Sequence, residues 1–95
     1  MRVLRVLPRA SRDLAEACEH YEAISTKLAS RFEAEIDAAF ARILEYPLMY
    51  QIVHREIHRA VLHDFPYLVF YEVEQDAIVV HRVLLGLRDP EYWPR

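Results

Sequence analysis

The chain has little of what several protein classes require. Its single cysteine, Cys18, cannot form an intramolecular disulfide, which excludes a disulfide-stapled secreted domain. With one glycine and five prolines, it also lacks a collagen-like or linker-rich composition. No window holds the roughly 18 to 20 uninterrupted apolar residues of a membrane-spanning helix, and the N-terminus carries an arginine every few residues. The sequence therefore predicts a soluble, cytoplasmic protein.

The length and composition are those of one small packed domain. The 95 residues leave no room for a second domain. Hydrophobic residues make up 54% of the chain and aromatic residues 12%, which is enough apolar surface for a core. We expect a single domain over residues 1–95, with residues 87–95 as a C-terminal tail.

Charge is distributed unevenly along the chain. Residues 2–12 carry four arginines and no acid, residues 13–45 carry eight acids against three basic residues, and residues 50–95 carry seven acids against five arginines. The net charge is −3 and the pI is about 5.9. Binding to nucleic acid by charge alone requires a strongly basic face, so we expect no free-standing DNA binding.

The spacing of apolar residues predicts a strand followed by a helix hairpin. Residues 3–7 alternate apolar residues with arginine, and Pro8 ends this strand because proline cannot donate to a sheet. Apolar residues then recur at helical spacing from an N-cap at Ser11 to Ile24. The Ser25-Thr26 pair offers a second N-cap, and the helix after it ends before Pro47.

After Pro47 the apolar period changes from 3.6 to 2. Residues 57–63, 67–74 and 77–84 are rich in Val, Ile, Tyr and Phe and predict three consecutive antiparallel strands. The order βααβββ corresponds to an α+β fold of two layers, with the helix hairpin packed on one face of an antiparallel sheet.

Several motifs carry a family resemblance. The second half contains Arg59, Phe65-Pro66-Tyr67-Leu68-Val69-Phe70-Tyr71, the strand of residues 78–84, and Arg88-Asp89-Pro90-Glu91-Tyr92-Trp93-Pro94-Arg95. The first half contains Asp13-Leu14, Tyr21-Glu22, Leu28-Ala29, Arg31-Phe32, Glu35-Ile36, Ile43 and Pro47. In this order the chain resembles the RelE/ParE superfamily of type II toxin–antitoxin toxins, closer to its ParE-like branch. The resemblance covers nearly the whole chain.

The resemblance implies a bacterial toxin that is held inactive by an antitoxin encoded beside it, in a system of the plasmid-stabilisation kind. ParE-like members inhibit DNA gyrase, whereas RelE-like members cleave mRNA on the ribosome, mainly with lysines, arginines and a tyrosine. Here Lys27 is the only lysine, and it lies in the helix hairpin. Leu85 and Leu87 stand where many ParE-like relatives carry polar residues. Both features argue against a nuclease. We therefore expect a gyrase inhibitor that acts by protein–protein binding. A RelE-like endonuclease is the alternative, and a non-toxic antitoxin-binding partner is a third possibility.

The tail is the expected target-binding segment. It gathers two arginines and two aromatic residues in eight positions, a composition typical of interface anchors. The predicted target-binding residues are Arg88, Tyr92, Trp93 and Arg95. We expect the tail to be needed for toxicity and not for folding.

The endonuclease alternative has its own candidate residues. Glu56 would act as the base and His81 as the acid, while Arg59, Arg82 and Arg88 would stabilise the phosphate. The competing explanation for these residues is an ordinary polar strand surface with ion pairs.

We expect no metal and no cofactor. His54 and His58 have the spacing of a helical metal pair, but in an extended segment that spacing separates them by about 13 Å. Cys18 falls among positions expected to face the core, which indicates a buried thiol and not a nucleophile.

Overall fold

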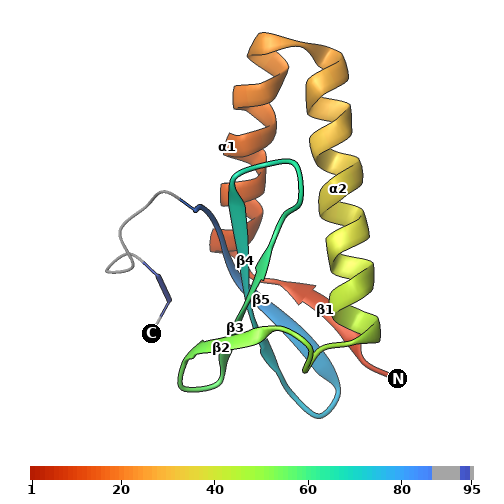
Figure 1. Ribbon diagram of the computed structural model, residues 1–95, viewed down its shortest axis with the longest axis vertical. Coiled ribbons are helices and arrows are strands. Elements are labelled where there is room, and N and C mark those ends of the chain that lie inside the picture. Colours follow the sequence, from red (N-terminus) through yellow and green to blue (C-terminus); the bar gives the residue numbers. More distant parts are fainter. Residues whose placement is uncertain (87–92, 95) are drawn as a thin grey trace.

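The computed structural model describes residues 1–86 and 93–94. Within these residues, two antiparallel helices cover one face of a five-stranded sheet, so the α+β class and the helix hairpin are confirmed (Figure 1). The elements are β1 (Val3–Val6), α1 (Pro8–Ile24), α2 (Thr26–Glu45), β2 (Gln51–His54), β3 (Ile57–Val61), β4 (Tyr67–Val73) and β5 (Ala77–Leu85). Within the described residues, neither helix has the length and hydropathy that a membrane-spanning helix requires.

The sheet differs from the prediction in two details. Its strand order is β1-β5-β4-β3-β2, and β1 runs parallel to β5, so the sheet is mixed and not wholly antiparallel. Four alternating residues predict a strand but carry no signal for its direction. In addition, β2 is a short edge strand that the sequence analysis did not predict, and a turn at Arg55 and Glu56 joins it to β3.

The two helices begin for different reasons. α1 begins at Pro8 and not after Ser11, and Leu7 is its N-cap. Proline suits the first helical position because an N–H at that position would have no partner within the helix. The predicted cap of α2 is confirmed, since the Ser25 hydroxyl accepts a hydrogen bond from the Leu28 N–H at 3.2 Å. The chain therefore leaves β1 and enters α1 almost at once.

Both faces of the sheet carry buried apolar residues. On the helix side, Phe32 and Ile43 of α2 pack with Tyr71 and Val80, and all four are fully buried. The opposite face carries a smaller cluster, which consists of Ile57, Leu68, Phe70 and Leu84 with the partly buried Val53 and Trp93 packed against it. The structure therefore has a second, smaller core on the sheet face away from the helices, which the two-layer prediction did not include.

Candidate functional site

Of the predicted target-binding residues, Trp93 lies in the described part of the chain. Its ring packs on Phe70 of β4, with the ring centroids 5.3 Å apart. Trp93 is partly buried in the small cluster on the sheet face away from the helices. The remaining three residues, Arg88, Tyr92 and Arg95, lie outside the described residues.

Arg59 of β3 lies against the same tryptophan. Its guanidinium carbon is 5.6 Å from the centroid of the Trp93 ring, and its Nη2 donates to Gln51 Oε1 at 3.0 Å. The Nε of Arg59 and the Nε1 of Trp93 are both buried without a hydrogen-bond acceptor within the described structure. Arg59 thus helps to hold Trp93 against the sheet, a role that its sequence position did not indicate.

The structure brings Glu56 and His81 together. Both line one shallow hollow with Arg55, Ile57 and Glu72, at the end of the sheet where β2 turns into β3. His81 is the extra residue of a bulge in β5: Tyr71 pairs with Val80, Phe70 pairs with Arg82, and His81 has no opposite residue. The bulge therefore sets the position of the His81 side chain at this hollow.

Glu72 is the hollow residue that the sequence analysis missed. His81 Nε2 lies 3.1 Å from Glu72 Oε1, and each side chain is 29% exposed. Glu72 pairs with Val79 across the β4–β5 ladder, which places it next to the bulge. The register between β4 and β5 would have identified Glu72 as a neighbour of His81, but that register could not be read from the sequence.

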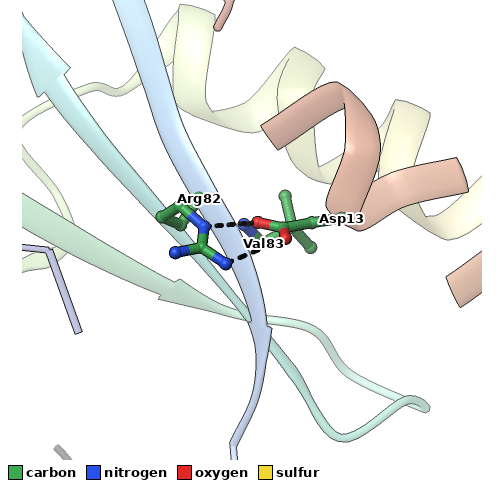
Figure 2. A network of polar contacts seen from close by, with 3 residues as sticks. All are labelled: Asp13, Arg82 and Val83. Carbon is green, nitrogen blue, oxygen red and sulfur yellow. Dashed lines mark hydrogen bonds and ion pairs between the residues drawn. The ribbon is translucent and has the colours of Figure 1, made fainter. Parts of the chain in front are cut away.

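Arg82 contacts the helix hairpin and does not line the hollow. Its Nε and Nη2 donate to Asp13 Oδ2 and Oδ1 at 2.8 Å and 3.0 Å, and Asp13 Oδ2 also accepts the Val83 N–H at 2.9 Å (Figure 2). These hydrogen bonds raise the pKa of Arg82. Both charges of the pair are largely removed from solvent, with 18% and 11% of the side chains exposed. Arg82 is thus bound to a carboxylate and is not the free phosphate-stabilising cation that the endonuclease hypothesis expects.

The position of Asp13 follows from the early end of β1. β1 pairs with β5 only as far as Val80, because Pro8 turns the chain into α1. The edge of β5 beyond Val80 would be open, and Asp13 in α1 supplies an acceptor there for the Val83 N–H. One carboxylate therefore completes the sheet edge and anchors α1.

The two histidines that were considered as a metal pair have separate roles. His58 is buried in β3, where its Nδ1 donates to the Tyr50 carbonyl at 2.8 Å and its ring stacks on Tyr71 at a centroid distance of 5.0 Å. His54 is exposed at the end of β2. Within residues 1–86 and 93–94, no group of three His, Cys, Asp or Glu side chains is arranged to hold a metal ion.

The family model of the ParE toxin of type II toxin–antitoxin systems, parDE, matches residues 4–90. The chain belongs to the ParE toxin family. A solved structure described as the chromosomal ParDE toxin–antitoxin system from P. aeruginosa matches with a TM-score of 0.72 and 16% sequence identity, over 90% of this chain and 96% of that one. At that identity the match supports the fold alone. No curated protein sequence matches the chain.

The family match does not extend over the whole set of predicted target-binding residues. It ends at residue 90, so it includes Arg88 and the hollow of Glu56 and His81, but not Tyr92, Trp93 or Arg95. The roles of those three residues in target binding therefore stay predictions that rest on composition and, for Trp93, on its place against the sheet.

This ParE-type toxin also has an apolar groove between its helices. The groove is lined by Leu14, Cys18, Phe32 and Ile36, with the carboxylates of Glu33 and Asp37 beside them. Cys18 is partly buried there, and burial together with the Glu33 charge raises the pKa of its thiol. The thiol is therefore protonated at neutral pH and is poorly suited to act as a nucleophile.

Proposed function

We propose that this ParE-type toxin inhibits DNA gyrase by protein–protein binding and is neutralised by a cognate antitoxin. The observation that carries the proposal is the family match over residues 4–90, which covers all the helices and strands of the described fold apart from the first residue of β1. Within the superfamily, resemblance to the ParE-like branch implies gyrase and not the ribosome. Because gyrase acts on chromosomal DNA, we place the toxin in the cytoplasm.

The contacts of two arginines support binding over catalysis. An endonuclease needs cations available to the developing charge on the phosphate. Arg82 is already held by Asp13, and Arg59 contacts Gln51 and the face of Trp93. Using either cation in catalysis would require these contacts to be exchanged, whereas a binding surface needs no such exchange.

The tail supplies the proposed gyrase contact. Arg88, Tyr92, Trp93 and Arg95 have the residue types that dominate protein interfaces. Trp93 is held by Phe70 and Arg59, so its ring has a fixed partner on the sheet and loses less conformational freedom on binding.

The inter-helix groove supplies the proposed antitoxin contact. Its floor is apolar, and Glu33 and Asp37 place negative charge at its side. A segment of the antitoxin that folds on binding and carries apolar residues flanked by basic ones fits this chemistry.

One observation favours the second candidate, a ribosome-dependent endonuclease. Glu56 and His81 do lie in one hollow, where a carboxylate and an imidazole are the groups that acid–base cleavage of RNA requires. Against this, His81 is paired with Glu72, which also occupies the hollow.

Two assays on the purified toxin separate the candidates. We expect inhibition of supercoiling by gyrase, no cleavage of mRNA in a translating extract, and reversal of the inhibition by the antitoxin encoded at the same locus. In cells, DNA-damage signalling should precede any loss of mRNA after induction of the toxin alone. Cleavage of mRNA without an effect on gyrase would establish the endonuclease. Activity in neither assay, with no growth arrest, would indicate a non-toxic antitoxin-binding protein.

A further inference from the structure

The first twelve residues carry positive charge that the rest of the described structure does not neutralise. They hold four arginines and no acid. All four side chains are exposed, and we name them the arginine patch: Arg2, Arg5, Arg9 and Arg12. No ion pair of the described residues includes a member of this patch.

The structural roles that arginines have elsewhere in this fold do not explain the arginine patch. Arg82, for example, is held by the Asp13 carboxylate. Within the patch, Arg2 Nε donates to the Glu74 carbonyl at 2.9 Å, and this neutral acceptor leaves the charge uncompensated. Arg9 lies in the first turn of α1, which contains no acid, and positive charge at that end of a helix is unfavourable because of the helix dipole. Helix stability therefore does not account for it.

The arginine patch follows the β1 edge of the sheet and the beginning of α1. Leu4 and Val6 pack against the core on the helix side, so Arg5 between them faces outward. α1 starts two residues after β1 ends, and its first turns carry Arg9 and Arg12 (Figure 1). These two are three positions apart, which makes them neighbours on the helix surface. The charges are therefore gathered on one short stretch of exposed chain.

The composition of the patch selects the kind of partner. Residues 1–12 contain no Phe, Tyr or Trp. Protein interfaces usually combine arginine with buried aromatic anchors, and single-stranded nucleic acid is held by stacking its bases on aromatic side chains. The phosphate backbone of a duplex, in contrast, is bound through arginine and lysine charges alone. Duplex DNA is therefore the partner that this surface fits best.

We propose that the arginine patch contacts the phosphates of duplex DNA when a target holds the toxin close to DNA. The patch is too small to hold DNA by itself at physiological salt, because four phosphate contacts lose about a hundredfold in affinity between about 50 and 200 mM salt. The net charge of −3 opposes binding further, which agrees with the expectation of no free-standing DNA binding. The patch therefore supplies an accessory contact, apart from the proposed gyrase and antitoxin surfaces.

Fluorescence anisotropy of a short labelled DNA duplex, titrated with the purified toxin at increasing salt, tests the proposal. We expect weak binding at about 50 mM salt, with a slope of about −3 to −4 in log affinity against log salt. Arg5→Gln combined with Arg9→Gln should reduce the size of that slope by about 2 and weaken binding by about tenfold or more. Lys27→Gln combined with Arg31→Gln is the matched control. It removes the same charge from exposed positions of α2 and should leave the slope unchanged.

Thermal melting and amide chemical shifts complete the test. The substituted side chains are exposed, so both double variants should keep a cooperative transition, and the duplex should shift the amides of residues 2–12. Absence of binding at low salt, or equal losses in the two double variants, overturns the proposal. Tighter binding of poly-glutamate or of single-stranded RNA than of the duplex also overturns it, and would assign the patch to an acidic protein segment or to RNA. The assay contains neither gyrase nor antitoxin, so its failure is distinct from failure of the proposed function.

Discussion

Asp13 and Arg82 are 69 residues apart in the chain, yet they form a two-pronged ion pair that fastens α1 to β5. The same carboxylate accepts the Val83 N–H, so it replaces the neighbour that β5 loses where β1 ends. The pair therefore links the geometry of the sheet edge to the position of the helix hairpin.

The first prediction concerns this pair. Asp13→Asn should lower the free energy of unfolding by about 2–3 kcal/mol, because it leaves the Arg82 guanidinium largely desolvated without its counter-ion. Glu19→Gln, at an exposed position of the same helix, should change stability by less than about 0.5 kcal/mol. Urea unfolding of both variants is the measurement. Equal effects of the two substitutions would show that the pair contributes nothing.

The second prediction concerns Tyr71, which is fully buried and donates its hydroxyl proton to the Pro47 carbonyl. Tyr71→Phe should cost about 1–2 kcal/mol at neutral pH, because the carbonyl loses its partner. Burial, and then the charge of Tyr50, raise the pKa of Tyr71. A raised pKa means that the stabilisation is complete below the unfolded value of about 10 and decreases as pH rises above it.

The free energy of unfolding should therefore fall more steeply above about pH 10 in the parent than in Tyr71→Phe. Tyr46→Phe is the control, since Tyr46 is exposed and its substitution should leave the free energy of unfolding nearly unchanged. Parallel alkaline profiles for the parent and Tyr71→Phe would contradict the assignment of a buried neutral phenol.

The sequence predicted the parts of the fold that depend on local patterns. The Ser25 cap of α2 and the strand of residues 67–74 are set by near neighbours and by apolar periodicity, and both were confirmed within a residue or so. The predicted start of α1 after Ser11 was wrong, because Pro8 was considered only as the end of a strand and not as the first residue of a helix. The parallel pairing of β1 with β5 depends on contacts between distant residues, which periodicity does not encode.

The same distinction applies to the candidate site. Glu56 and His81 were placed together on the expectation that their strands lie close, and the structure does bring them into one hollow. Glu72 was missed because its contact with His81 depends on a bulge, and a bulge shifts register without a clear local signal. Ion pairs were the competing explanation for these strand residues, and Arg82 does form one, but its partner Asp13 was not identified because the contact joins two layers of the fold.

The third prediction concerns the tail. Trp93→Ala should lower the free energy of unfolding by about 1–2 kcal/mol, since the ring packs on Phe70 and beneath Arg59. Trp93→Phe should retain most of that stability. If Trp93 also contacts the target, growth arrest in Trp93→Ala should fall by more than the loss of folded protein explains. Val61→Ala, at an exposed apolar position of β3 outside the tail, is the control for both readouts.

A chain truncated after Gly86 extends that test. It should still unfold cooperatively and bind antitoxin, because the large core lies on the helix side of the sheet, but it should lose growth arrest. Loss of the cooperative transition would mean that the tail is required for the fold, and the proposed target-binding role would then lack support.

The last prediction separates the two mechanisms through the hollow. Toxicity should survive both Glu56→Gln and His81→Ala, because neither residue belongs to the proposed gyrase contact. General acid–base groups typically contribute about 10²- to 10⁴-fold each, so an endonuclease without either group should be almost inert. A gyrase inhibitor should lose only what the side chain adds to strand stability, and His81→Ala removes one partly exposed ion pair with Glu72. Growth arrest and supercoiling assays should therefore stay within a few-fold of the parent once thermal melting has shown that each variant is folded. If folded variants lose all toxicity while the parent cleaves mRNA in a translating extract, Glu56 and His81 are catalytic and the endonuclease mechanism is correct.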